Sequence, residues 1–292
     1  MGAPLASSTS YTPPECSGRP TVPNLGKCSS ASTSSITSVV RARSVFAFLV
    51  ACAALQRVGA QTTTADTVVA PRRFRLAATQ LGPGQFTYQT TLERGTGTTE
   101  IGTRTTSVSI TSYAGLAAWL LVETRTGDGV NATDTLFAGL SDLHPIHWSS
   151  SLAGARLAAE FRGDTVYGAT SAPSGRRSMV TSIPPGTIVS GSMLEAALRV
   201  LPLQMAWEDS TSTLSISLSS SSVIPTRLSV IGEDRVRVPA GTYDCWVVAV
   251  HADPGRGLYW VSKQNPIIVR SAIDVPSMGG AQLVSALVRT TR

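Results

Sequence analysis

The chain has 292 residues and a formal net charge of +6 at neutral pH. The 232 residues from position 61 onward suit one large β domain or two small ones. The sequence has no apolar stretch of the roughly 20 residues that a membrane-spanning helix needs, which excludes a helix of that kind.

Residues 1–40 are rich in Ser, Thr and Pro and have no apolar period. Such a segment cannot bury enough surface to offset the entropy of its chain. We therefore expect residues 1–40 to be disordered, or to precede the natural start of the protein, with Val39 or Val40 as its first residue.

The next segment, residues 41–60, is predicted to be a signal peptide. Arg41 and Arg43 form a positively charged start, and an apolar run of 11 residues extends from Val45 to Leu55. The short side chains at 58–60 suit a signal peptidase. The competing interpretation, a buried core helix, accounts less well for the arginines and the cleavage pattern. The protein is thus expected to be exported to the periplasm or beyond the cell.

A second cleavage site is compatible with the same segment. Leu49-Val-Ala-Cys52 matches the motif at which bacterial lipoproteins are cut. Cleavage before Cys52 instead of after Ala60 would leave a protein anchored by lipid. Plain secretion is preferred because the lipoprotein cut would leave only a short apolar core.

Removing the leader changes the charge and cysteine arguments. Five basic residues and Glu15 lie before Gln61, so the net charge falls from +6 to +2. The remaining basic residues form no cluster, which argues against a nucleic-acid partner. Only Cys245 remains of the four cysteines, so an internal disulfide is impossible and Cys245 is expected to act as a small core residue.

Residues 61–80 are expected to form a linker, and 81–292 a single β domain. Residues 86–92 and 235–238 alternate apolar and polar side chains, which predicts half-exposed antiparallel strands. Residues 246–250 are apolar on both faces and should lie in a covered strand. We expect a mainly β fold of about 10–12 strands, forming a curved antiparallel sheet or a half-open β-barrel.

One amphipathic helix is predicted within this β domain. Ser192 and Glu195 have the spacing of a capping box, and Pro202 marks the end of the helix. Apolar residues follow at helical spacing at positions 194, 197, 198 and 201. The helix is expected to plug or cover the curved sheet, and packing on one face of the sheet is the alternative.

The sequence offers few candidates for chemistry. His144 and His147 form the only histidine pair, with Asp142 nearby as a third possible metal ligand. Pro145 argues against a helix there, so exposed imidazoles in a loop are the preferred interpretation and no metal site is predicted. The Gly-x-Ser-x-Gly motif of serine hydrolases is missing. We predict neither a cofactor nor an enzyme.

Large apolar residues are candidates for lining a cavity, although filling the core is the more usual role of tryptophan in a sheet. The candidates for binding an apolar ligand are Trp119, Trp207, Leu194, Leu198, Trp246 and Trp260.

The C-terminal third carries a distinctive pattern. Residues 238–244 spell Val-Pro-Ala-Gly-Thr-Tyr-Asp, and strands containing Trp260-Val-Ser and Pro266-Ile-Ile follow. This resembles a family of bacterial exported domains of unknown function, over about residues 225–290. The resemblance implies a fold similar to the half-open barrels of periplasmic lipoprotein carriers, in which a curved sheet wraps an apolar cavity under a helical lid. It implies no reaction and no catalytic residues.

Three hypotheses for function remain. The first is an exported, non-enzymatic half-barrel that binds a lipid or acyl chain in the bacterial envelope. The second is an envelope module that holds a protein partner through an edge strand or an arginine-rich face. The third is a hydrolase or metal enzyme around His144 and His147. An apolar pocket under the predicted helix would favour the first, and a packed interior would favour a scaffold.

Overall fold

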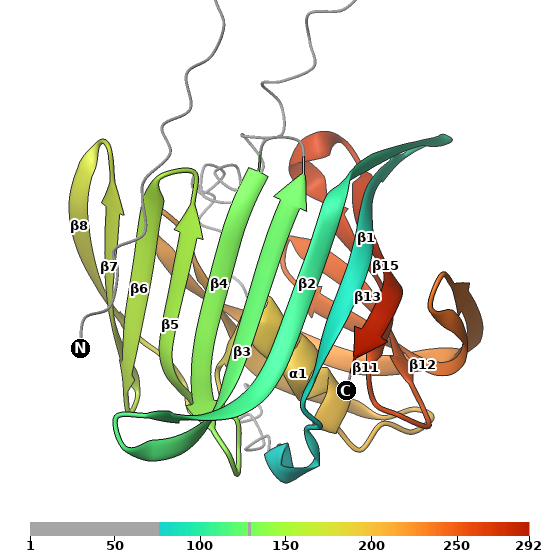
Figure 1. Ribbon diagram of the computed structural model, residues 1–292, viewed down its shortest axis with the longest axis horizontal. Helices are drawn as coiled ribbons and strands as arrows, with labels where there is room; N and C mark the ends of the chain where they lie inside the picture. The colour runs from blue at the N-terminus through green and yellow to red at the C-terminus, as the bar shows by residue number, and fades with distance from the viewer. Residues whose placement is uncertain (1–75, 128–129, 292) are drawn as a thin grey trace, which may run out of the picture. The chain divides into compact units, whose positions relative to one another are not determined.

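A computed structural model describes residues 76–127 and 130–291 of the chain (Figure 1). The predictions for 1–40, for the signal peptide at 41–60 with Cys52, and for most of the linker at 61–80 lie outside these residues. The described part confirms a mainly β fold, with 15 strands in one antiparallel sheet that curves and does not close. Among these residues no helix has both the length and the apolarity to cross a membrane.

The first part of the fold is an up-and-down run of hairpins. The 3-10 turn η2 (Ala78–Gln80) precedes eight strands: β1 (Gly84–Arg94), β2 (Gly97–Tyr113), β3 (Leu116–Gly127), β4 (Val130–Gly139), β5 (Pro145–Leu152), β6 (Ala155–Arg162), β7 (Thr165–Ala172) and β8 (Gly175–Ser182). The chain then forms the short strand β9 (Ile188–Val189) and the helix α1 (Ser192–Val200).

A second run of hairpins completes the sheet. It consists of β10 (Glu208–Ile216), β11 (Ser221–Val238), β12 (Gly241–Ala252), β13 (Gly255–Ser262), β14 (Ile268–Val275), the 3-10 turn η3 (Pro276–Met278) and β15 (Ala281–Thr291). The number of strands exceeds the expected 10–12 for a physical reason. The strand β8 is almost entirely exposed and β9 has two residues, so neither shows an apolar alternation in the sequence.

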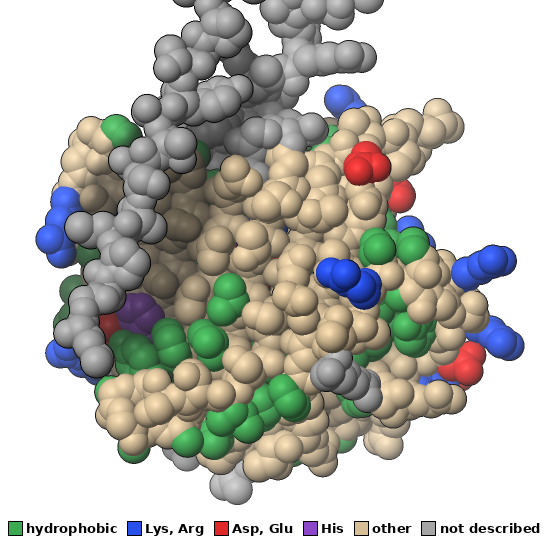
Figure 2. All heavy atoms as spheres, viewed as in Figure 1, with side chains coloured by type: hydrophobic (Ala, Val, Ile, Leu, Met, Phe, Trp, Pro, Cys, Tyr) green, Lys and Arg blue, Asp and Glu red, His purple; other side chains and the backbone are tan. Residues whose placement is uncertain are grey.

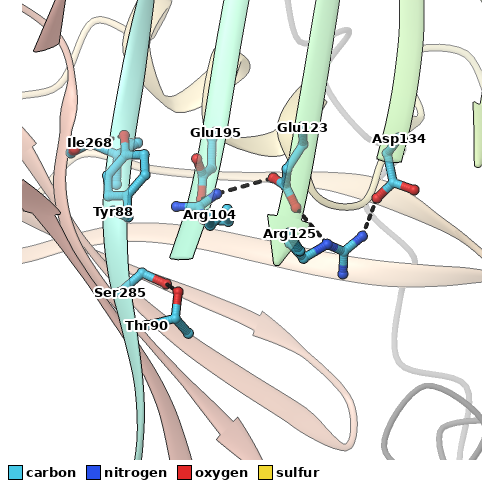
Figure 3. A network of polar contacts seen from close by, with 9 residues as sticks. All are labelled: Tyr88, Thr90, Arg104, Glu123, Arg125, Asp134, Glu195, Ile268 and Ser285. Atoms are coloured by element: carbon cyan, nitrogen blue, oxygen red, sulfur yellow. Dashed lines mark hydrogen bonds and ion pairs between the residues drawn. The ribbon is translucent and has the colours of Figure 1, made fainter. Parts of the chain in front are cut away.

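The first and last strands join the two halves. β1 pairs with β15, so the order runs from β8 through β1 and β15 to β10 and β9. Every pair is antiparallel except β9 with β10. The two wings of the sheet approach each other where the hydroxyl groups of Thr181 in β8 and Ser221 in β11 form a hydrogen bond. The inner face of the sheet, on which Tyr88 and Arg104 point toward α1, is therefore wrapped around the helix (Figures 1 and 3).

The helix is buried on every side. Each residue from Ser192 to Val200 is less than 9% exposed, so α1 plugs the fold. The predicted capping box is wrong: Gly191 is the N-cap, and no side chain caps the helix. Glu195 points into the protein instead, because a buried arginine on β2 pairs with it. A buried carboxylate without a partner is costly, so Glu195 pairs with the arginine and does not cap the helix.

The hairpin of the C-terminal motif docks against the last strand. Val238 is directly opposite Gly241 in the β11–β12 pair, so Pro239 and Ala240 form the loop. The amide of Ala240 donates a hydrogen bond to the carbonyl of Leu287 at 3.1 Å, which holds the tip against β15. The motif therefore has a structural role. Cys245, in β12, is fully buried as predicted, and burial raises the pKa of its thiol to about 12.

Candidate functional site

Some of the predicted lining residues meet inside the fold. Leu194 and Leu198 lie on α1 and are buried in the core. Trp119 is buried on the inner face of β3, and its indole Nε1 donates to the carbonyl of Leu140 at 3.4 Å. Trp207 lies just before β10 and is half-buried against the same core.

The other two tryptophans lie on opposite faces of the sheet. Trp260 is directly opposite Val247 in the β12–β13 pair, so these two side chains share a face. Trp246 is one residue before Val247 and therefore points the other way. The Lys263 ammonium lies 4.0 Å from the centre of the Trp246 ring, whereas Trp260 donates to Asp234 at 2.9 Å. Trp246 and Trp260 thus cannot line one cavity together.

The space beneath α1 is filled. A cavity of about 10 Å³ lies between α1, β1, β2 and the residues leading into β14. That volume is about what a single water molecule occupies. It is lined by Phe86, Tyr88, Thr106, Val108, Ser192, Glu195, Ala196, Arg199, Ile267 and Ile268. An acyl chain can enter this space only if α1 moves.

A small group of charged side chains is buried beside the helix, within an otherwise hydrophobic core (Figure 3). Arg104 Nη1 donates to Glu123 Oε2 at 3.1 Å and to Glu195 Oε1 at 2.7 Å. Arg125 lies beside Glu123, at 3.2 Å between Nε and Oε1, and also pairs with Asp134. We call these five residues the buried ionic cluster. They connect α1 to the adjacent strands β2, β3 and β4.

Burial raises the pKa of two carboxyl groups in this cluster. Burial raises the pKa of Glu195, and Glu123 adds to the increase while Arg104 opposes it. Burial likewise raises the pKa of Asp134 against the attraction of Arg125. Tyr88 lies against Arg104, with 4.3 Å between the guanidinium carbon and the ring centre, and its hydroxyl donates to the carbonyl of Ile268 at 3.0 Å. With no room for a substrate, this cluster is suited to holding the helix in place.

His147 lies on the outer face of the sheet, away from α1. Its Nδ1 is 2.7 Å from Glu160 Oε1, and the Tyr113 hydroxyl donates to the same oxygen at 3.3 Å. The ring of Tyr113 stacks on His147 at 5.6 Å and contacts Phe137 at 4.5 Å between ring centres. His144 lies in the loop before β5. In the described ranges no three His, Cys, Asp or Glu side chains come together as a metal site.

The strand register extends this group into a row across five strands. Phe137, His147, Glu160, Tyr167 and Val180 lie directly opposite one another on β4 to β8. Tyr167 is 45% exposed and Val180 is 67% exposed, so the β7–β8 end of the row is an apolar surface in contact with solvent.

A groove of about 350 Å³ runs beside this row on β6, β7 and β8. One wall is formed by Glu160, Tyr167 and Val180, and the other by Ala158, Ala169 and Ser178. The floor is the backbone between these rows, at positions 159, 168 and 179. Because the two walls are the rows that point outward, the groove opens on the outer face. Figure 2 shows this face recessed between β4 and β8.

These features define a class of protein: a curved, open antiparallel sheet with a helical plug, a buried ionic cluster beside that helix and a groove on its outer face. Residues 84–283 match the family model "Protein of unknown function (DUF3108)", and the chain belongs to that family. No curated protein sequence matches the chain.

Three solved structures are similar over much of the chain. A β-barrel-like protein of the DUF1849 family from Brucella abortus is 14% identical, with a TM-score of 0.47, over 72% of this chain and 97% of that one. A candidate outer membrane lipoprotein-sorting protein domain from Vibrio parahaemolyticus is 7% identical over 72% and 85%, with a TM-score of 0.24. A DUF1329 family protein from Desulfovibrio piger is 12% identical over 71% and 84%, with a TM-score of 0.22.

Sequence reasoning missed both the groove and the buried ionic cluster. Gly168 marks a close approach on the inner face, where the side chain of Met179 occupies the space beside it, and so gives no signal for the groove. A signal for the cluster was present in Glu123, which shares its face of β3 with the buried residues Trp119 and Leu121. An acid at an inward position of a strand requires a buried partner.

Proposed function

We propose that this protein is exported to the bacterial envelope and binds an apolar ligand, such as an acyl chain, without catalysing a reaction. The binding site in this proposal is the groove on the outer face of β6–β8. The observation that carries it is the contrast in volume: the groove holds about 350 Å³, and the cavity under α1 about 10 Å³. Small-molecule sites in proteins have volumes of about 300–1,000 Å³.

The composition of the groove supports an apolar ligand. Tyr167 and Val180 expose apolar surface in one wall, and Ala158 and Ala169 form most of the other. The floor carries no charged side chain, since it is the backbone at positions 159, 168 and 179, whose side chains point to the inner face. Each methylene group that moves from water into such a groove contributes about 0.8 kcal/mol to binding.

The site expected under the helix, lined by Leu194, Leu198 and Trp119, is a second location for the same activity. A ligand there would have to displace α1. The contacts of Glu195 with Arg104 oppose that movement, because breaking a buried ion pair costs about 3–5 kcal/mol. The outer groove requires no such rearrangement.

Groove filling tests the proposal. The purified protein is titrated with N-phenyl-1-naphthylamine, a neutral apolar dye, and the dye is then displaced with dodecanol. The variant Ala169→Trp places an indole in the groove and should abolish dye binding. The control Ala252→Trp makes the same change at a half-buried position of β12 and should bind as the wild type does. Equal binding by Ala169→Trp and the wild type would rule out the groove and direct attention to the space under α1.

A second candidate function is recognition of a protein partner through β8. This strand ends the sheet, pairs only with β7 in the described ranges, and exposes Arg176 and Arg177. An extended acidic segment could add to this edge as a further strand. Binding of envelope proteins that is lost in a Val180→Pro variant, which bends β8, and retained in Ala169→Trp would favour this function over ligand binding.

A further inference from the structure

A row with two arginines borders the groove on the side of the wall formed by Ala158, Ala169 and Ser178. Arg156, Ser171 and Arg176 lie directly opposite one another on β6, β7 and β8. They occupy the outer face two residues beyond Ala158, Ala169 and Ser178, so the two rows are about 7 Å apart along the strands. We call these three residues the arginine row.

Both arginines of this row have guanidinium groups available for a ligand. Arg156 and Arg176 are exposed, and neither forms an ion pair with any residue in the part of the chain that the structure describes. Figure 2 shows basic side chains along the β8 side of the recessed face. Adjacent strands are about 4.8 Å apart, so the backbones of Arg156 and Arg176 are separated by about 10 Å. Two long side chains at that distance can converge on one anion.

The groove is electrostatically asymmetric. The wall on the far side from the arginine row carries charges of both signs. His147 and Tyr113 hold the carboxylate of Glu160 in place, and the guanidinium carbon of Arg162 lies 5.2 Å from the centre of the Tyr167 ring. The wall on the near side is low, because Ala158 and Ala169 carry only a methyl group. An anion at the far wall meets Glu160 as well as Arg162, whereas an anion that passes over the alanines meets two arginines and no carboxylate in their row.

We infer that the ligand is an anionic single-chain amphiphile, a fatty acid, whose hydrocarbon chain lies in the groove and whose carboxylate binds Arg156 and Arg176. This inference rests on the proposed function, since it assigns the head group of the ligand that the groove binds. Guanidinium groups suit carboxylates because their planar fork can donate two parallel hydrogen bonds.

The exposure of Arg156 and Arg176 to solvent limits how much they add to the affinity for a carboxylate. The arginines face solvent, so each contact with the carboxylate is screened and worth about as much as a surface ion pair. Two such contacts correspond to a difference of roughly fivefold to twentyfold in affinity. The difference should shrink in about 1 M salt, where the Debye length is about 3 Å.

The test compares dodecanoate with dodecanol, which have the same chain length and differ in charge. Both are titrated by dye displacement into the wild type, into Arg156→Gln/Arg176→Gln, and into Arg235→Gln/Arg237→Gln. The last variant removes the same charge from exposed positions of β11 and serves as the matched control. We expect the wild type and the control to bind dodecanoate about fivefold to twentyfold more tightly than Arg156→Gln/Arg176→Gln does, with dodecanol unaffected.

The outcomes separate the two proposals. If dodecanol and dodecanoate both bind in the groove and Arg156→Gln/Arg176→Gln weakens neither, the head-group assignment is wrong and the apolar groove stands. If that variant weakens dodecanol as much as dodecanoate, the arginines shape the groove and do not select the carboxylate, which also overturns the assignment. If neither compound binds to the wild type, the proposed function itself fails.

Discussion

Replacing Arg104 with methionine should strongly destabilise the fold. Arg104 is about 8% exposed, and its Nη1 donates to both Glu123 and Glu195. The variant Arg104→Met keeps much of the side-chain length and leaves two buried carboxylates without their shared donor. Removing one partner of a buried ion pair costs about 3–5 kcal/mol.

A neutral replacement of the helix carboxylate should be much milder. In Glu195→Gln the amide oxygen can still accept a hydrogen bond from Arg104, and Glu123 still balances its charge. We expect a loss of about 1 kcal/mol or less. The comparison is informative because both variants alter the same 2.7 Å contact, and only Arg104→Met removes the donor from a buried Glu195 carboxylate, while Glu123 keeps Arg125.

Chemical and thermal unfolding, followed by circular dichroism, measures the difference. For a domain of this size, 1 kcal/mol corresponds to about 2–4 °C, so Arg104→Met should lower Tm by about 6–20 °C. The double variant completes a thermodynamic cycle, and the two changes should be coupled by at least about 0.5 kcal/mol. A cost below about 1 kcal/mol for Arg104→Met, or additive effects in the double variant, would refute the idea that the buried ionic cluster holds α1.

Three further predictions concern the pKa of Glu195, two strand glycines and the hydroxyl of Tyr88. Because burial raises the pKa of Glu195, the folded protein holds that proton more tightly than the unfolded chain does. The free energy of unfolding of the wild type, relative to Glu195→Gln, should therefore fall as the pH rises above about 4.3, the ordinary glutamate pKa. Denaturant titrations at pH 4 to 7 measure this difference, and a difference that does not decline would contradict the prediction. Gly102→Ala should cost more than about 1 kcal/mol in urea unfolding, since its Cβ would lie 2.1 Å from the carbonyl oxygen of Thr126, whereas Gly232→Ala, which meets nothing within 4 Å, should be neutral within about 0.5 kcal/mol. Tyr88→Phe should cost about 1 kcal/mol by the same measurement through loss of the hydrogen bond to Ile268, and an unchanged midpoint would show that this bond adds nothing.

Local patterns in the sequence were sufficient to predict the class of fold. The alternation around Phe86 and Val236 depends only on the two-residue period of a strand, and the structure places both in antiparallel pairs. The apolar spacing from Leu194 onward depends only on the helical period, and α1 forms over these residues with its N-cap one residue before the predicted Ser192. The burial of Cys245 followed from its apolar neighbours.

The tertiary structure alone decided which residues meet. Glu195 suits a helix cap by its spacing, and it became a buried partner of Arg104 because β2, about 90 residues earlier in the chain, is brought against the helix. Trp246 and Trp260 are similar in sequence context, but the register of β12 and β13 sends them to opposite faces. The groove depends on the pairing of β6, β7 and β8, which places small residues from three strands in one row. Periodicity sets the face on which a side chain lies relative to its own strand or helix, and pairing and curvature determine what that face contacts.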